Sequence, residues 1–323
     1  MGISMNRKVL TGTDLKVSDI CLGTAEYGTK ISEADSWKQM DCFLEAGGNF
    51  IDTARIYADW IPGERGRSEH TIGKFLKASG KRQEVIISTK GVHSDLVTGK
   101  ARVNPECICE DLEKSLEALQ TDYIDQYFLH RDDIKVPAEE LLGTLEEARK
   151  AGKIRWYGCS NWTLERLKEA DRIAEREGMS GFVCNQLMWS LADINRGGIS
   201  DTSLVMMDQG TYSYHTQTKK SVMAFTSIAK GYLTKKAEGR EITPSLAAQY
   251  ENPVNDRILE LVREAELPIS EFAFAYFFFQ LFPAVPIASF HTVEQLEIGI
   301  KSSELNVPEG LINDIKRLKK HSI

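Results

Sequence analysis

The sequence predicts an α/β fold in which eight β/α units close into a barrel. Short apolar segments alternate with longer amphipathic segments along the 323 residues, as a βα-repeat fold requires. Eight of the apolar segments have the length and composition of buried strands. Polar residues stand at the ends of several of them, which is where barrel active sites are found.

Local signals predict the individual elements. The expected strands are residues 20–25, 49–54, 85–90, 124–130, 154–160, 182–187, 222–225 and 285–288. Typical N-cap residues, such as Ser32, Asn104 and Thr163, begin the segments between them. Several of these segments end at a glycine, as left-handed helix C-caps do: Gly47, Gly80, Gly152 and Gly178. Residues 9–17 predict a hairpin that covers the lower end of the barrel.

Two segments interrupt the regular spacing. Residues 194–220 separate the sixth and seventh strands, and residues 234–255 follow the seventh. Long loops at the C-terminal face of a barrel are usually functional. Residues 255–280 predict two more helices. Because no linker or low-complexity run appears, we expect residues 1–323 to form a single barrel domain.

Composition limits the classes of function. A net charge of −7 argues against a nucleic-acid partner, and the apolar share of 42% allows a sizeable core. The six cysteines show no zinc-like spacing, and the N-terminus carries no apolar signal core. The apolar run at residues 272–288 is broken by Pro283 and is too short for a membrane span. We therefore expect a cytoplasmic protein without a membrane partner. Self-association stays possible.

Four residues carry most of the functional information. Lys90 and His130 each end an expected strand, Asp52 lies near the end of another, and Tyr57 lies in the loop after Asp52. An acid, an amine, an imidazole and a phenol at the ends of successive strands can converge at one mouth of a barrel. Any one of them alone is more often a surface or capping residue. They do not form a zinc ligand set, so we predict no metal.

Further motifs follow in order along the chain. Residues 154–162 read IRWYGCSNW, residues 185–187 read NQL, and residues 222–231 read VMAFTSIAKG. Together with the four residues above, these segments resemble the motifs of the aldo-keto reductases over nearly the whole chain. The closest likeness is to the shorter-looped bacterial members and the potassium-channel β-subunit branch. The resemblance implies a (β/α)8 TIM barrel with an N-terminal β-hairpin and extended loops at its C-terminal face.

The resemblance also implies roles for the four residues. Tyr57 is the expected general acid/base, Lys90 tunes it, Asp52 positions Lys90, and His130 orients and polarises the carbonyl group. A free phenol, with a pKa near 10, is a poor proton donor at neutral pH, and a neighbouring ammonium lowers its pKa by favouring the phenolate.

The implied cofactor is NADP(H), with NAD(H) possible. The residues that match the cofactor motifs are Gly23, Thr24, Asp52, Ser160, Asn161, Gln186, Phe225, Thr226, Ser227, Ile228, Lys230, Gly231, Lys236, Ser289, His291 and Gln295. The segment that holds the adenosine end departs from the family pattern. His291 replaces the usual Arg, Lys or Ser, and Ile298 and Gly299 replace a Glu and an Asn. These changes bear on the choice between NADP and NAD more than on the fold.

The candidate substrate residues are Trp60, Arg131 and Trp162. Charged groups and indoles at a barrel mouth suit polyhydroxylated substrates, although a solvated charged loop is the alternative. We predict an oxidoreductase that interconverts the carbonyl group of an aldehyde, ketone or sugar with its alcohol. A cofactor-binding regulatory subunit with little turnover is the alternative, and a degenerate nucleotide binder is a third possibility.

Overall fold

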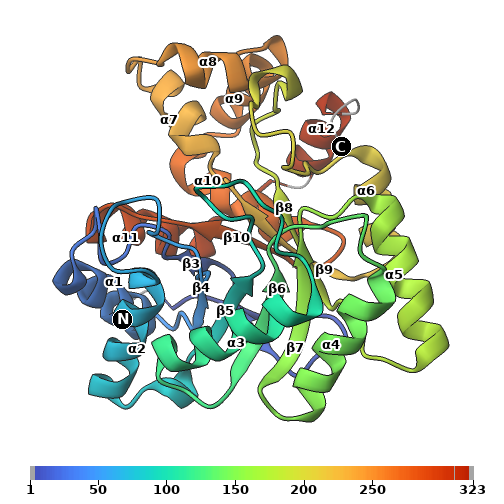
Figure 1. Cartoon of the computed structure of the whole chain (residues 1–323). Coiled ribbons are helices and arrows are strands. Elements are labelled where there is room, and N and C mark those ends of the chain that lie inside the picture. Colours follow the sequence, from blue (N-terminus) through green and yellow to red (C-terminus); the bar gives the residue numbers. More distant parts are fainter. Residues whose placement is uncertain (1–3, 309, 320–323) are drawn as a thin grey trace.

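The computed structural model describes residues 4–308 and 310–319, and its centre is a closed barrel of eight parallel strands (Figure 1). The strands are β3 (Cys21–Gly23), β4 (Phe50–Asp52), β5 (Ile86–Gly91), β6 (Ile124–Leu129), β7 (Ile154–Ser160), β8 (Cys184–Met188), β9 (Ser221–Phe225) and β10 (Ala284–Ala288). Each strand pairs with the next in the sequence, and β10 closes the barrel against β3. All eight expected strands are confirmed, with ends shifted by a few residues.

The structure also contains helices, most of which surround the barrel on its outer face (Figure 1). They are α1 (Glu33–Glu45), α2 (Arg67–Ser79), α3 (Pro105–Leu119), α4 (Ala138–Lys150), α5 (Leu164–Glu177), α6 (Gln209–Thr218), α7 (Tyr232–Ala237), α8 (Pro244–Tyr250), α9 (Pro253–Glu264), α10 (Ile269–Ala275), α11 (Val293–Lys301) and α12 (Leu311–Leu318). Of these, α7, α8 and α9 lie above the barrel (Figure 1). The side chains of Ser32, Asn104 and Thr163 accept N–H bonds from the first turns of α1, α3 and α5. Gly80 and Gly178 end α2 and α5 in the left-handed conformation.

The expected hairpin is present and closes the lower end of the barrel. Strands β1 (Arg7–Val9) and β2 (Lys16–Ser18) pair antiparallel. Leu10, Leu15 and Val17 are buried against residues inside the barrel, among them Phe50 at the start of β4 and Val183 directly before β8. The apolar positions of a short hairpin thereby shield the barrel interior from water.

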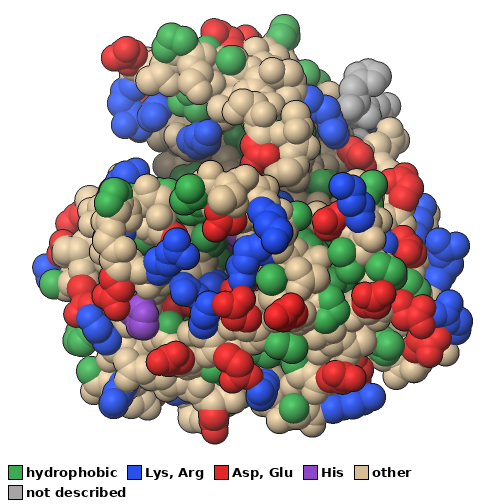
Figure 2. Space-filling model, viewed as in Figure 1, with side chains coloured by type: hydrophobic (Ala, Val, Ile, Leu, Met, Phe, Trp, Pro, Cys, Tyr) green, Lys and Arg blue, Asp and Glu red, His purple; other side chains and the backbone are tan. Residues whose placement is uncertain are grey.

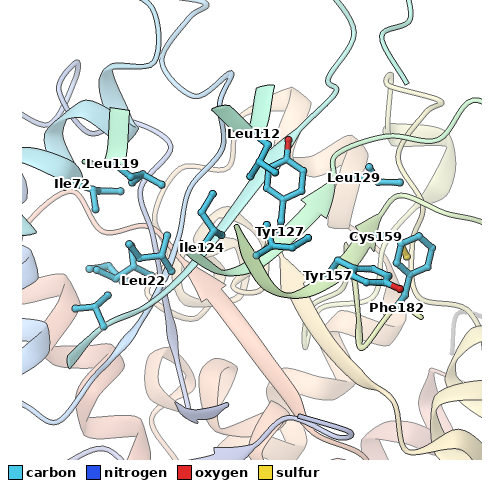
Figure 3. Packing of buried hydrophobic residues seen from close by; sticks show 14 of the residues in the cluster. Leu22, Ile72, Leu112, Leu119, Ile124, Tyr127, Leu129, Tyr157, Cys159 and Phe182 are labelled. Carbon is cyan, nitrogen blue, oxygen red and sulfur yellow. The ribbon is translucent and has the colours of Figure 1, made fainter. Parts of the chain in front are cut away.

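The largest part of the core lies between the strands and the helices that cover them (Figure 3). Ile72 of α2 and Leu119 of α3 pack with Ile124 of β6, and all three side chains are fully buried. The close approach of α2 and α3 depends on Gly73, because a Cβ atom there would stand 2.2 Å from the carbonyl oxygen of Ala118. Ile51 of β4 and Ile87 of β5 belong to the same cluster, and these two strands carry two of the candidate catalytic residues.

The second long segment lies above the C-terminal end of the barrel, where α7, α8 and α9 gather, and the first long segment includes α6, which lies beside α5 (Figure 1). Hydrogen bonds join the start of the first segment to the end of the second. The backbone N–H of Asn195 donates to the carbonyl of Gln249 at 2.8 Å, and the N–H of Asp193 donates to Asn255 Oδ1 at 2.7 Å. The two further helices expected in residues 255–280 are α9 and α10. No helix in the described part of the chain is long and apolar enough to cross a membrane.

Candidate active site

The barrel topology brings the strand-end residues together. Asp52 is the last residue of β4, and Lys90 lies near the end of β5, which pairs with β4 in parallel. His130 follows the last residue of β6, the next strand in the barrel. Since parallel strands end at the same face, the three side chains share one mouth, and the loop after β4 adds Tyr57.

Lys90 is the centre of this group. Its Nζ atom donates to Asp52 Oδ2 at 2.7 Å, to the carbonyl oxygen of Thr53 at 2.6 Å and to the hydroxyl of Tyr57 at 3.1 Å. An ammonium group has three N–H donors, so all three have partners. The side chains of Lys90 and Asp52 are almost completely buried. The ammonium is therefore held in one position against the phenol.

Asp52 is in turn held from its other oxygen. Gln186 Nε2 donates to Asp52 Oδ1 at 2.9 Å, and the hydroxyl of Ser88 donates to the same atom at 3.2 Å. Gln186, which the sequence assigns to the cofactor, is thus also a support of the ion pair. This bond uses one of the two N–H donors of its amide, which leaves the other donor and the carbonyl oxygen for further partners.

Burial has the largest effect on the pKa of the Tyr57 phenol. It raises the pKa of Tyr57 above its ordinary value, although the ammonium of Lys90 opposes this by favouring the phenolate. Lys90 therefore acts on this pKa in the expected direction, but burial outweighs it. Burial also lowers the pKa of Lys90, but the charge of Asp52 and the hydrogen bonds outweigh it and the net shift is upward. Both shifts favour the protonated forms, an ammonium at Lys90 and a phenol at Tyr57.

His130 is a neutral imidazole beside the phenol. Its ring centroid lies 6.0 Å from that of Tyr57 in an edge-on arrangement. Burial, together with the charge of Lys90, holds the pKa of His130 well below its usual range. Its Nδ1 atom is buried and has no hydrogen-bond partner within the described residues. A neutral imidazole can donate a hydrogen bond to a carbonyl oxygen without bringing a second positive charge.

A groove of about 670 Å³ begins at Asp52 and Tyr57 and runs between the barrel and α7. Figure 2 shows the molecule hollowed between the helices above the barrel and the barrel itself. The cofactor residues expected from the sequence that line this groove are Gly23, Thr24, Asp52, Phe225, Thr226, Ser227, Ile228, Lys230, Gly231, Ser289, His291 and Gln295. Residues from β3, β9 and β10 thus meet along one elongated depression.

The groove has the chemistry that a dinucleotide needs. Lys230 is joined there by Lys235 and Arg240, which the sequence reasoning missed. The backbone has positive φ at Thr226, Ala229 and Lys230. A turn of this kind, combined with several cations, suits a diphosphate group. At the other end, His291 and Gln295 flank the first turn of α11, whose N-cap is Thr292. The residues present therefore fit a nicotinamide dinucleotide.

Several expected residues lie elsewhere. Lys236 does not line the groove, because it forms an ion pair with Asp256 and contacts the hydroxyl of Tyr232 at 3.3 Å. Asn161 is buried with a φ of 60°, and its amide contacts Ser160 Oγ at 3.0 Å. Ser160 and Asn161 thus lie at the end of β7, outside the lining of the groove.

The three expected substrate residues differ in access. Trp162 is fully buried against Phe182, with ring centroids 4.9 Å apart, so the expectation that it faces a substrate is wrong. Trp60 is 48% exposed, and its ring centroid lies 6.1 Å from that of Tyr57. Arg131 lies 3.5 Å from Asp201, which comes from the long segment after β8. Trp60 and Arg131 remain available at the mouth.

A (β/α)8 barrel with a buried Asp–Lys pair, a phenol and an imidazole beside a dinucleotide-shaped groove defines a class of barrel oxidoreductases. The profile of the Aldo/keto reductase family matches residues 19–320, and the chain belongs to this family. Its members are oxidoreductases that generally use NAD(P)H.

Full-length relatives agree with this assignment. The chain is 28% identical over 325 residues to the uncharacterized oxidoreductase YrpG of Bacillus subtilis, with 96% of each chain covered. It is 28% identical to the protein tas of Escherichia coli, with 94% of each chain covered. It is 26% identical to norsolorinic acid reductase stcV of Emericella nidulans, covering 94% of this chain and 78% of that one.

Proposed function

We propose that this protein interconverts a carbonyl group, in an aldehyde, ketone or sugar, with the corresponding alcohol, and that Tyr57 is the general acid/base. The observation that carries the proposal is the saturated ammonium of Lys90, which joins Asp52 and the hydroxyl of Tyr57 at the end of the cofactor-sized groove. Relatives named as oxidoreductases and a reductase support the same class of reaction.

NADP(H) is the proposed cofactor, and when bound, its reduced nicotinamide supplies the hydride. The chain's own residues would hold it in the groove. Phe225 would stack on the nicotinamide ring, Lys230 and Arg240 would neutralise the diphosphate, and His291 would stand at the adenosine end. NAD(H) is a second candidate, because no arginine stands at position 291.

Tyr57 would donate a proton to the substrate oxygen while His130 orients that oxygen with a neutral N–H. The raised pKa of Tyr57 keeps the phenol protonated at neutral pH, which is the form that reduction requires. After the transfer, the phenolate would lie beside the ammonium of Lys90, which stabilises its charge. Asp52 would keep that ammonium in place.

The test is to incubate the purified protein with NADPH or NADH and a panel of aldehydes, ketones and sugars, following loss of the reduced nicotinamide. Tyr57→Phe should lose roughly 10²–10⁴-fold in turnover while cofactor titrations stay unchanged. A Tyr57→Phe protein within about threefold of wild type would remove Tyr57 from the mechanism. Tight cofactor binding without turnover on the whole panel would instead favour the binding subunit.

A further inference from the structure

A second pocket, of about 190 Å³, opens beside the end of β5. We call it the outer pocket; it is lined by the loops after β4 and β5 and by α3, and the residues used below are Arg55, Arg65, His93, Arg102 and Asp111. Figure 2 shows Lys and Arg side chains gathered on this face above α3. None of these residues belongs to the cofactor groove.

The acidic side chains of the outer pocket already have partners. Asp111 accepts two bonds from Arg102, both at 2.8 Å, and one from the backbone N–H of Val92 at 2.8 Å. Asp59 accepts from the N–H of Gly66 at 2.6 Å. The hydrogen-bonding capacity of these carboxylates is largely used within the protein.

The other two acids are committed in the same way. Asp95 accepts from the N–H groups of Val97 and Thr98 and from the hydroxyl of Thr98, which closes its own loop. Glu110 is paired with Lys114 and Arg102. The carboxylates therefore stabilise the two loops, α3 and Arg102. Two other arginines of the pocket have no carboxylate partner among the described residues.

Those two arginines are Arg55 and Arg65. Within the described residues, neither guanidinium takes part in a hydrogen bond or an ion pair; Arg55 is half-buried and Arg65 is exposed. The Nε atom of Arg55 is completely buried and has no acceptor. The nearby Glu69 compensates Arg55 only in part, because burial raises the pKa of that carboxyl to about 7. A buried donor without an acceptor is costly, and an oxyanion would remove the cost.

The outer pocket also adjoins the catalytic group. Lys90 contributes to its wall. His93 lines it as well, and the ring of His93 packs edge-on against that of His130 with centroids 4.8 Å apart. Lys90 and the packed rings of His93 and His130 thus form the boundary between the outer pocket and the catalytic group.

We propose that the outer pocket binds an oxyanion through Arg55 and Arg65, and that this anion is the phosphate or carboxylate group of the carbonyl substrate. The planar fork of a guanidinium matches the oxygens of both groups. This inference rests on the proposed function for the reaction itself, and it narrows the substrate class to small aldehydes or ketones that carry an acidic group.

The first experiment compares charged and uncharged substrates with NADPH: glyceraldehyde 3-phosphate against glyceraldehyde, and succinic semialdehyde against butanal. The wild-type protein should have the higher kcat/KM for the charged member of at least one pair. Arg65→Met should lower that preference about tenfold, which corresponds to about 1.4 kcal/mol, because it removes a charged hydrogen-bond donor, and should leave the uncharged substrates unchanged. Arg172→Met, an exposed arginine on α5, is the matched control. Arg55→Met should act like Arg65→Met if it folds.

The second experiment titrates inorganic phosphate calorimetrically into protein saturated with NADP⁺, so that the cofactor groove is occupied. Phosphate should bind the wild type and the Arg172→Met control, and should bind Arg65→Met at least about tenfold more weakly. It should also compete with the charged substrate and not with the uncharged one. Phosphate binding without any preference for charged substrates would overturn the assignment to the substrate and leave a free-anion site.

No phosphate binding and no preference would overturn the whole inference while the proposed function stands. If no carbonyl compound is turned over, the proposed function fails, but the phosphate titration of wild type and Arg65→Met still decides whether the outer pocket is an anion site.

Discussion

The ammonium of Lys90 lies 3.1 Å from the hydroxyl of Tyr57, yet the pKa of that phenol is raised and not lowered. The reason is that the same burial that fixes the ammonium also removes the solvent that would stabilise a phenolate. Lys90 compensates for this desolvation only in part. The site thus holds a neutral phenol next to a cation that is ready to receive the phenolate charge.

The pH dependence of reduction should reflect this arrangement. The acid must be protonated to act, so a raised pKa moves the loss of activity to higher pH. We expect kcat/KM for reduction to stay flat through neutral pH and to fall only above about pH 10, the ordinary range of a phenol. The pKa of His130 is lowered, so any change in kcat/KM caused by its titration should occur below the usual pH range of histidine. A fall between pH 6 and 8 in the wild-type protein would contradict this.

Lys90→Met should be destabilising as well as inactive. It leaves the carboxylate of Asp52 buried without its cation, and breaking a buried pair in this way costs about 3–5 kcal/mol. Urea unfolding measures the loss. The double variant Asp52→Asn with Lys90→Met is the control: it should recover part of the stability and none of the activity. Equal stability of both variants would show that the unpaired carboxylate is not the cause.

Phe225→Ala should weaken cofactor binding by about 1 kcal/mol, or about fivefold, through lost stacking and apolar contact. Cofactor titration by fluorescence measures it. Phe290→Ala, which removes another aromatic side chain that lines the groove, tests whether the effect is specific to the nicotinamide end. Phe290→Ala should weaken the binding of NADPH and the binding of the isolated adenosine fragment by the same factor. Unchanged affinity in Phe225→Ala would show that this ring supports the core alone.

His291→Arg should tighten NADPH more than NADH, because an arginine fork suits the 2′-phosphate that only NADPH carries. In the structure His291 Nδ1 lies 3.5 Å from Glu26, so part of its capacity is directed at a carboxylate. Glu26→Gln should therefore shift the preference the same way by a smaller amount. If neither variant changes the NADPH-to-NADH affinity ratio, His291 does not contact the 2′-phosphate.

Gly73→Ala should destabilise the fold by about 1–3 kcal/mol, because the new methyl group would meet the backbone of α3, which cannot rotate away. Thermal unfolding measures the change. Gly143→Ala on α4 is the matched control: nothing lies within 4 Å of its added Cβ atom. It should stabilise the protein by up to about 1 kcal/mol through helix propensity. Equal effects of the two substitutions would mean that the α2–α3 contact is looser than described.

The barrel and the four catalytic candidates could be predicted because their signals are local. Each strand is a run of apolar residues, and Asp52, Lys90 and His130 each stand within one residue of a strand end. Once the strands are parallel, their ends must lie at one face. The same reasoning found most of the groove, since its walls are the segments that follow β3, β9 and β10.

The loops could not be predicted at the level of single side chains. Lys235 and Lys236 are neighbours in the sequence, but on α7 they point in different directions, so that the first lines the groove and the second pairs with Asp256. Trp162 follows the end of a strand, as His130 does, yet its side chain is fully buried and packs against Phe182. Nothing within a few residues of either position records these contacts.

The sequence by itself therefore determined the architecture and the chemical character of the barrel mouth, because periodicity and strand-end position are properties of short segments. Only the tertiary structure decided which side chains the solvent reaches, how Gln186 supports Asp52, and that burial outweighs Lys90 in setting the pKa of Tyr57. These depend on residues far apart in the chain, and the free energy of a charge depends on everything that surrounds it.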